Sequence, residues 1–408
     1  MSPSGQIRNR TLGFAAAQTL VAALAWSAVP ADVTTLVADD GDANDFFGFS
    51  VALDGDTAVI GAQGDDDDGD DSGAAYVFSR TGSGWSRQAK LTADDGAAGD
   101  QFGGSVALSG ETALIGARRD DGNGDGAGAA YVFTRSGAGW SQQIKLTATD
   151  GAAGAEFGYS VALSGDTAIV GAAKDDHKGD DSGSVYVFTR SGTGWSQEAK
   201  LTAADGAEGD VFGISVALCG DTALIGADLD DDNGENSGAA YVFTRSNGTW
   251  RQQTKLTAAD GEAVDIFGVR VALSGDTALI AARRDDDDVN GVDSGSAYVF
   301  VRSGTSWSQQ ARLTADDGEA GDMFGYNVAL SEDTAVVTAA MDDDEADNSG
   351  AAYVFARSET GWSQQARFTA PNGAADDVFG WSVALSGSTV VIGARTAGRR
   401  KDRRRSSY

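Results

Sequence analysis

Residues 157–210 read FGYSVALSGDTAIVGAAKDDHKGDDSGSVYVFTRSGTGWSQEAKLTAADGAEGD, and the next Phe-Gly pair follows one residue later. The same unit recurs along the 408-residue chain. Its seven Phe-Gly pairs begin at Phe47, Phe102, Phe157, Phe212, Phe267, Phe324 and Phe379, with spacings of 55, 55, 55, 55, 57 and 55 residues. A fixed period of this length is the signature of a repeat architecture, because each copy buries its apolar face against its neighbours.

Four short stretches of the quoted unit are rich in strand-forming residues: 160–163, 167–171, 184–189 and 198–203. Gly, Ser and Asp clusters bound them, and no window has a helical period. Tight hairpin turns are expected at 164–166 and, slightly longer, at 190–194. Four antiparallel strands per unit, repeated radially, describe a β-propeller blade, so we expect an all-β, seven-bladed propeller.

Two other architectures are compatible with a repeat of this length: a linear β-solenoid and a string of separate small domains. A unit of this size buries too little surface to be stable alone. The chain has only three prolines and no Pro-rich or Ser-rich linker between copies. Closed radial packing is therefore favoured.

The repeated FGxSVALSGDTALIGA pattern, followed by GAAYVF, resembles the FG-GAP repeat. That repeat builds the seven-bladed propeller at the amino end of integrin alpha chains and occurs in many bacterial surface proteins. The resemblance runs from Phe47 to about Ala394, and the Gly-Ala-Pro part has drifted to Gly61-Ala62-Gln63 or Gly116-Ala117-Arg118. It implies a secreted or cell-surface adhesion module.

One feature of the calcium-binding members of that family is missing. Their Asp-rich ion loop lies in the first hairpin, which is shortened here to Ser109-Gly110-Glu111 or Ser164-Gly165-Asp166. So short a turn cannot surround an ion. The family's calcium site is therefore not expected in any copy.

The acidic residues are concentrated in two other loops of each unit. The chain holds 61 acids against 30 bases, with a net charge of −31. One acidic loop joins strands two and three (65–71 in the first copy), and the other joins strand four to the next copy (94–100). Turns alternate between the two ends of an up-and-down blade, so both loops should emerge on one face. The arginines after each third strand should emerge on the opposite face: Arg80, Arg135, Arg190, Arg245, Arg302 and Arg357.

An oxygen-rich face of this kind suits hard cations, and Ca²⁺ accepts about six to eight oxygen ligands. The sequence-based candidates for a calcium site are the loop residues Asp66, Asp68, Asp70, Asp121, Asn123, Asp125, Asp176, Asp180, Asp230, Asp232, Glu235, Asp286, Asp288, Asp343 and Asp347. The spacing of Asp121, Asn123 and Asp125 matches the start of an EF-hand loop, but Val132 stands where that loop has Glu. The alternative is a solvated acidic surface that confers solubility or salt tolerance.

Few residues offer catalytic chemistry. The only histidine is His177, and the only cysteine is Cys219 in a turn. A non-catalytic protein is therefore expected, the alternatives being a hydrolase with paired channel carboxylates or a purely structural envelope component. Six tryptophans occupy the same position of the repeat. They either pack over blade edges or bind sugars, and their recurrence from copy to copy favours the packing role. These are Trp85, Trp140, Trp195, Trp250, Trp307 and Trp362.

The two ends depart from the repeat. Residues 1–31 have the pattern of a signal peptide cleaved after Ala31, although residues 20–26 lie near the phase of a third strand. The propeller should span 32–395, with the last blade closed by the amino-terminal strand near Leu36. Residues 396–408 form a basic, disordered tail in this interpretation. Expected partners are an extracellular protein or glycan, without nucleic acid or a membrane span, for a monomeric propeller.

Overall fold

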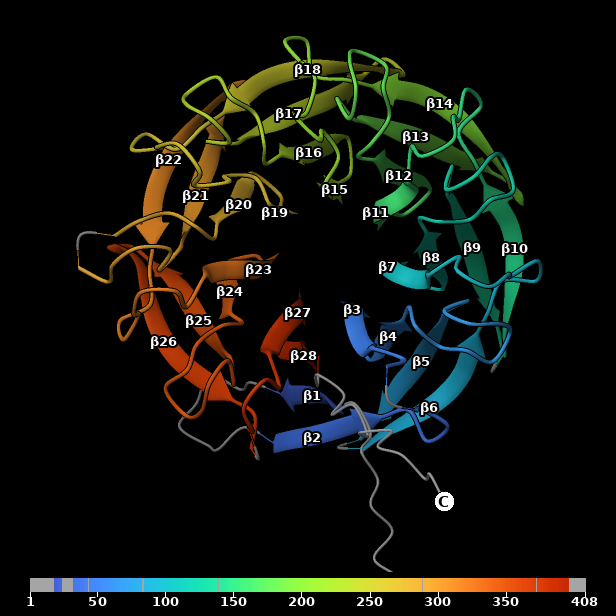
Figure 1. Cartoon of the computed structure of the whole chain (residues 1–408), viewed down its shortest axis with the longest axis horizontal. Helices are drawn as coiled ribbons and strands as arrows, with labels where there is room; N and C mark the ends of the chain where they lie inside the picture. Colours follow the sequence, from blue (N-terminus) through green and yellow to red (C-terminus); the bar gives the residue numbers. More distant parts are fainter. Residues whose placement is uncertain are drawn as a thin grey trace, which may run out of the picture.

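The structure is a computed structural model, described here for residues 18–23, 32–42, 44–82, 84–137, 139–287, 289–371 and 373–395. All regular elements in these ranges are β-strands, arranged as four-stranded antiparallel sheets around a central axis (Figure 1). The predicted all-β propeller is confirmed. In these same ranges, no long apolar helix that could cross a membrane is present.

The inner half of each sheet consists of a first strand next to the axis and a second strand outside it (Figure 1). The first strands are β3 (Phe47–Asp54), β7 (Phe102–Ser109), β11 (Phe157–Ser164), β15 (Ser215–Cys219), β19 (Arg270–Ser274), β23 (Phe324–Ser331) and β27 (Phe379–Ser386). The second strands are β4 (Thr57–Ala62), β8 (Thr112–Ala117), β12 (Thr167–Ala172), β16 (Thr222–Ala227), β20 (Thr277–Ala282), β24 (Thr334–Ala339) and β28 (Thr389–Ala394). Both faces of a second strand are covered, so these strands have continuous apolar runs instead of alternation.

The outer half consists of a third and a fourth strand. The third strands are β5 (Ala74–Thr81), β9 (Ala129–Ser136), β13 (Ser184–Ser191), β17 (Ala239–Ser246), β21 (Ser296–Ser303) and β25 (Ala351–Ser358). The fourth strands are β6 (Gly84–Leu91), β10 (Gly139–Leu146), β14 (Gly194–Leu201), β18 (Thr249–Leu256), β22 (Ser306–Leu313) and β26 (Gly361–Thr369).

The predicted strand positions of the quoted unit need one correction. The fourth strand begins at Gly194, four residues before the predicted start, and Ser191 pairs with Gly194 across a two-residue turn. A bulge explains the error, because Val187 pairs with Ala199 and Phe188 with Gln197, leaving Glu198 as an extra residue. The extra residue interrupts the alternating pattern from which a strand is predicted.

The Phe-Gly pair joins neighbouring sheets. Phe102 is 1% exposed and packs edge-on against Tyr131 and Phe133 of its own sheet, in a cluster that includes Val77 and Leu91 of the preceding sheet. Gly103 has φ +86°, and a Cβ there would lie 2.2 Å from the Ala74 carbonyl oxygen of the preceding sheet. The Phe-Gly pair therefore fills the contact between two neighbouring blades, and its glycine is needed for the close backbone approach.

The remaining sheet combines both ends of the chain, in the order β2-β1-β28-β27, with β1 (Gln18–Ala23) and β2 (Asp32–Val37) as its outer strands. β1 pairs with β28, with Leu20 opposite Ile392. On its other side β27 contacts the first sheet, where the Ser382 hydroxyl donates to the Gly48 carbonyl oxygen at 2.7 Å. The predicted closure by the amino-terminal strand is therefore observed for β2. Most of the predicted signal peptide (1–17 and 24–31) and the predicted tail (396–408) lie outside the described residues.

Candidate functional site

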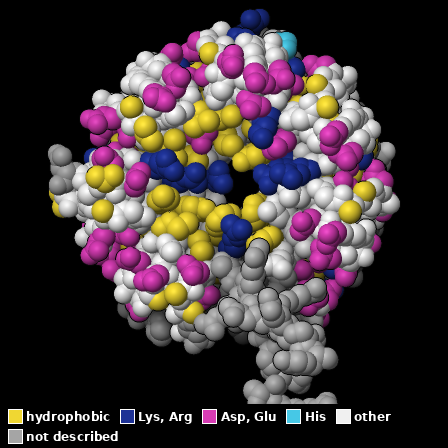
Figure 2. All heavy atoms as spheres, viewed as in Figure 1, with side chains coloured by type: hydrophobic (Ala, Val, Ile, Leu, Met, Phe, Trp, Pro, Cys, Tyr) yellow, Lys and Arg dark blue, Asp and Glu magenta, His cyan; other side chains and the backbone are white. Residues whose placement is uncertain are grey.

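The two acidic loops of each repeat lie against each other, as the strand alternation predicts. The loop between strands two and three meets the loop that leads into the next sheet through backbone hydrogen bonds. The Gly99 amide donates to the Asp70 carbonyl oxygen at 2.8 Å, and the Phe102 amide donates to Ser72 at 3.0 Å. Acidic side chains therefore gather around the rim of one face (Figure 2).

The first acid of each loop between strands two and three is buried and bound to two side chains of its own sheet. A tyrosine of the third strand donates a hydrogen bond to it, and a lysine or arginine of the fourth strand forms an ion pair with it. The six sets are Asp65, Tyr76 and Lys90; Asp120, Tyr131 and Lys145; Asp175, Tyr186 and Lys200; Asp230, Tyr241 and Lys255; Asp285, Tyr298 and Arg312; Asp342, Tyr353 and Arg367.

The same cation also reaches the acidic loop that follows the preceding sheet. Lys255 contacts Asp205 of that loop at 3.2 Å and Asp230 of its own sheet at 2.7 Å. We call this arrangement of one cation between two loops a clasp. Its six cations contact Asp40, Asp95, Asp150, Asp205, Asp260 and Asp317 of the preceding loops. The buried part of the acidic face therefore contains its own counter-ions.

The titration of these groups reflects the pairing. Burial alone would raise the pKa of Asp95 and lower that of Lys145. Instead, hydrogen bonds from Lys145 and Tyr131 lower the pKa of Asp95, and the bonds to Asp120 and Asp95 raise the pKa of Lys145. In this clasp the pairing favours the charged forms of Asp95 and Lys145.

The second acid caps the loop backbone in five of the six loops. The Asp66 carboxylate accepts a hydrogen bond from the Asp71 amide at 2.7 Å, and Asp121 accepts one from Gly126 at 2.7 Å. The donor residue has a left-handed backbone, with φ +53° at Asp71 and +60° at Gly126. Asp, Asn and Gly adopt this conformation most readily, which explains their occurrence at the end of every such loop.

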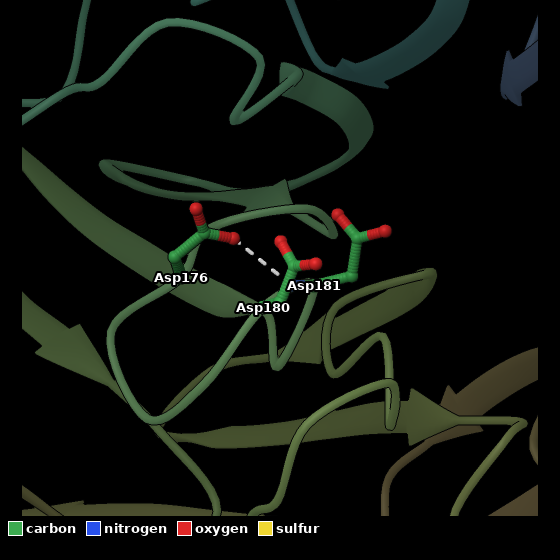
Figure 3. Close-up of side chains that lie close together, drawn as sticks. All are labelled: Asp176, Asp180 and Asp181. Carbon is green, nitrogen blue, oxygen red and sulfur yellow. Dashed lines mark hydrogen bonds between the residues drawn. The ribbon is translucent and has the colours of Figure 1, made fainter.

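In the third sheet three loop carboxylates converge. Ligand oxygens of Asp176, Asp180 and Asp181 all lie within 4.8 Å of one another (Figure 3). The Asp181 amide also donates to Asp176 at 2.9 Å, which holds the loop in shape. The donor set has the chemistry that Ca²⁺ prefers, and it supplies three of the roughly six to eight oxygens that the ion takes.

Most of the other sequence-predicted ligands do not converge in this way. Asp68, Asp70, Asn123, Asp125, Glu235, Asp343 and Asp347 are exposed on the loops. Asp286, like Asp66 and Asp121, caps a loop backbone through the Asp293 amide. Asp230 and Asp232 belong to the clasp of Lys255 at 2.7 and 2.5 Å, so their carboxylates are already bound to a cation. Asp288 lies outside the described residues.

A further set of acids, in the loop before six of the seven Phe-Gly pairs, forms no ion pair within the described residues, and all of these acids but Asp377 are buried. Each accepts a hydrogen bond from an amide three residues earlier: these acids are Asp45, Asp100, Asp210, Asp265, Asp322 and Asp377. Burial raises the pKa of Asp210 to about 6, with additional repulsion from Asp230. Asp265 and Asp322 behave in the same way. These groups mark where the face carries uncompensated negative potential.

The opposite face, formed by the hairpin turns, carries the predicted arginines, but most are neutralised. Arg190 pairs with Asp166 of the first hairpin and donates to the Thr112 hydroxyl of the preceding sheet at 3.0 Å. Asp56, Asp221, Asp276 and Asp333 pair with their arginines in the same way. This face is therefore a set of local ion pairs and not a basic surface.

The tryptophans that open the fourth strands pack between sheets. Trp195 and Trp250 are 8% and 7% exposed. The Trp195 indole N–H donates to Gln143 of the preceding sheet, as Trp307 does to Gln253. The packing interpretation is confirmed.

Comparison with known families agrees with this geometry. The family model of the FG-GAP repeat matches seven times, over residues 31–78, 85–133, 140–188, 195–243, 250–300, 307–355 and 362–408. The five internal matches each begin on a fourth strand and end on the third strand of the next sheet, so the sequence repeat spans two neighbouring blades. Comparison with curated proteins found no match.

Proposed function

The chain belongs to the FG-GAP repeat family, and we propose that it is an exported, non-catalytic binding or adhesion module with an anionic, calcium-binding loop face. The fold is one commonly used for binding and adhesion. The secreted or cell-surface location is supported by the amino-terminal sequence pattern, and the anionic face by the two acidic loops of each repeat.

The observation that carries the calcium proposal is the convergence of Asp176, Asp180 and Asp181 on an exposed loop. Unlike Asp175, these three carboxylates have no lysine or arginine partner within the described residues. The ligand oxygens of the three carboxylates lie within 4.8 Å of one another, so their negative charges repel. A divalent cation relieves that repulsion, and a carboxylate-rich loop is a hard-cation ligand set.

Calcium titration with thermal unfolding tests this proposal. If Ca²⁺ binds the native loops, millimolar Ca²⁺ should raise the unfolding midpoint, by about 2.7 kcal/mol of stability at 100 times the dissociation constant. The triple variant D176N/D180N/D181N should lose most of the shift. A charge-matched control, E111Q/E332Q/E359Q, changes three exposed acids of the hairpin face and should retain it. An equal shift in both variants, or none in the natural protein, contradicts the calcium proposal.

We also propose that the uncut chain forms seven blades, the last built from β27, β28, β1 and β2. Cleavage of a signal peptide after Ala31 would remove β1. A mature chain cleaved at that site therefore cannot contain this four-stranded last blade. The mass of the exported protein distinguishes the cleaved chain from the uncut one, because an amino terminus at Asp32 means that the last blade lacks β1. A variant that begins at Asp32 should then match the exported protein in its unfolding midpoint.

The hydrolytic alternative requires paired carboxylates in the channel. In the described part of the chain, the residues that line the axial cavity include no Asp or Glu. No observation therefore favours that alternative over the binding module.

A further inference from the structure

A cavity of about 220 Å³ lies on the propeller axis. Its wall is formed by residues that follow the Phe-Gly pair in all seven first strands, including Phe49, Tyr159 and Trp381. Serine hydroxyls and two arginines, Arg118 and Arg270, complete the lining. The cavity is therefore aromatic and cationic, unlike the rim.

The residue directly after the Gly-Ala pair of the second strand lines this cavity in one sheet, as Arg118. In three sheets it is an arginine whose guanidinium lies over an aromatic ring. Arg118 lies 5.3 Å from the Tyr159 ring centre, Arg283 lies 5.3 Å from that of Tyr326, and Arg395 lies 4.6 Å from that of Trp381. Stacking covers the flat face of a guanidinium and leaves its N–H edge available to an anion.

A buried carboxylate, that of Asp228, lies near two of these arginines, Arg270 and Arg283. Within the described residues, none of Arg118, Arg270, Arg283 and Arg395 forms an ion pair, although 25 such pairs occur elsewhere. Burial and repulsion from Arg270 lower the pKa of Arg283. Lys and Arg side chains form a ring around the central opening, inside the acidic rim (Figure 2).

Buried polar atoms without a hydrogen-bond partner occur at this same repeat position. They are Nε of Arg283, Oδ1 of Asp228 and Oε1 of Gln63, each on the residue after Gly-Ala or Ala-Ala. Asp228 is 7% exposed, and its burial raises its pKa, although Arg270 and Arg283 act against that shift. Leaving such atoms unpaired destabilises the protein, so a ligand that supplies their partners gains binding free energy.

We propose that the axial cavity binds a monosaccharide-sized ring carrying one carboxylate, a uronic acid in chemical class. The carboxylate accepts hydrogen bonds from the arginine edges, and the ring packs on the aromatic residues. Ring hydroxyls meet the serine hydroxyls and the Asn327 amide that line the cavity. The inference rests on the proposed binding function and names the ligand class for its centre.

The acidic rim adds selectivity. Charges further apart than about 10 Å are screened at 0.1 M salt, so a small monoanion reaches the axis. A polyanion such as a nucleic acid would place many charges against the rim loops, which repel it. The centre therefore suits one terminal or free uronic acid residue better than the middle of a polyanionic chain.

Titration calorimetry of the full-length protein with glucuronate, at about 0.15 M salt, tests the proposal. Glucose, which has the same ring without the carboxylate, should bind at least about tenfold more weakly, a difference of about 1.4 kcal/mol. Inorganic phosphate should also bind more weakly, because it has no ring. An oligosaccharide with a terminal glucuronate, compared with free glucuronate, identifies the source of the ligand.

R118Q and R270Q change the two arginines that line the cavity, which come from different sheets, so misfolding of one leaves the other informative. Each should weaken glucuronate binding about tenfold or more. R135Q is the matched control, because Arg135 lies on the hairpin face and donates to the Gly137 carbonyl oxygen. Absence of binding at about 10 mM glucuronate, equal binding of glucose or phosphate, or an equal loss in R135Q overturns the proposal. Repeating the titration with a chelator separates it from the calcium proposal, since glucuronate binding should persist.

Discussion

At the rim of the loop face the first acid of each loop between strands two and three has a lysine or arginine built beside it, whereas the axial cavity is lined by Arg118 and Arg270 and by no carboxylate. The rim clasp is the same in six sheets. The axial position changes from sheet to sheet, as Gln63, Arg118, Ala173, Asp228, Arg283, Ala340 and Arg395. Charged residues that recur from copy to copy stabilise the packing of the blades, whereas charged residues that differ between copies are available for ligand specificity.

The largest effect is expected for K255M, which removes the cation of one rim clasp. The Asp230 side chain is 4% exposed and would lose its counter-ion, while the methionine keeps the volume over the Tyr241 ring. Removing one partner of a buried pair costs roughly 3–5 kcal/mol. Urea unfolding should show this loss. As a control, D166N removes an exposed ion pair of the hairpin face and should cost no more than about 1 kcal/mol. Equal effects would mean that the clasp is an ordinary surface pair.

The pH dependence of stability sharpens the description of the rim. Burial raises the pKa of Asp45, Asp210, Asp265 and Asp322 to about 6, above the value of about 3.9 expected in the unfolded chain. The native state therefore binds more protons between these values, and this contribution to stability is lost as the pH rises through 6.

Lowering the pH from 7 to 5 should then stabilise the protein by about 1–2 kcal/mol after allowance for solvent screening. Below about pH 4 the gain reverses, because clasp carboxylates such as Asp95, whose pKa is lowered, become protonated. Denaturant midpoints at pH 5 and 7 measure the effect, and D265N/D322N should reduce it. A midpoint that is higher at pH 7 would contradict the assignment.

The fold was predictable because it depends on residues that every copy repeats. The spacing of the Phe-Gly pairs predicted the repeated sheets. The alternation of turns between the two ends of a blade predicted that both acidic loops lie on one face. The clasp was not predicted, although Lys90, Lys145, Lys200 and Lys255 recur in phase. To predict the clasp, one must know that the fourth strand of one sheet lies beside the loop that follows the preceding sheet. The two partners of this contact are about 50 residues apart in the sequence.

The axial site was missed for a different reason. Its residues are not a local motif, because the cavity takes one short segment from every sheet. The only sequence signal was the departure of Arg118 and Arg283 from the Gly-Ala-Pro pattern, which by itself indicates only drift. Likewise, the calcium candidates were chosen by spacing alone, which does not distinguish Asp180, in an exposed cluster, from Asp230, already bound to Lys255.

The smallest expected effect has the opposite sign to that of K255M. Arg283 is a partly buried cation with an unpaired Nε and a repulsive neighbour in Arg270, so R283M should raise stability by about 1 kcal/mol. In R283M the Asp228 carboxylate still has Arg270 nearby as a charge partner. Thermal unfolding measures this gain, and glucuronate calorimetry on the same variant should show weakened binding. If R283M instead lowers the stability, Arg283 is a structural counter-ion like the clasp cations. Gain of stability together with loss of binding is the behaviour expected of a residue retained for its ligand.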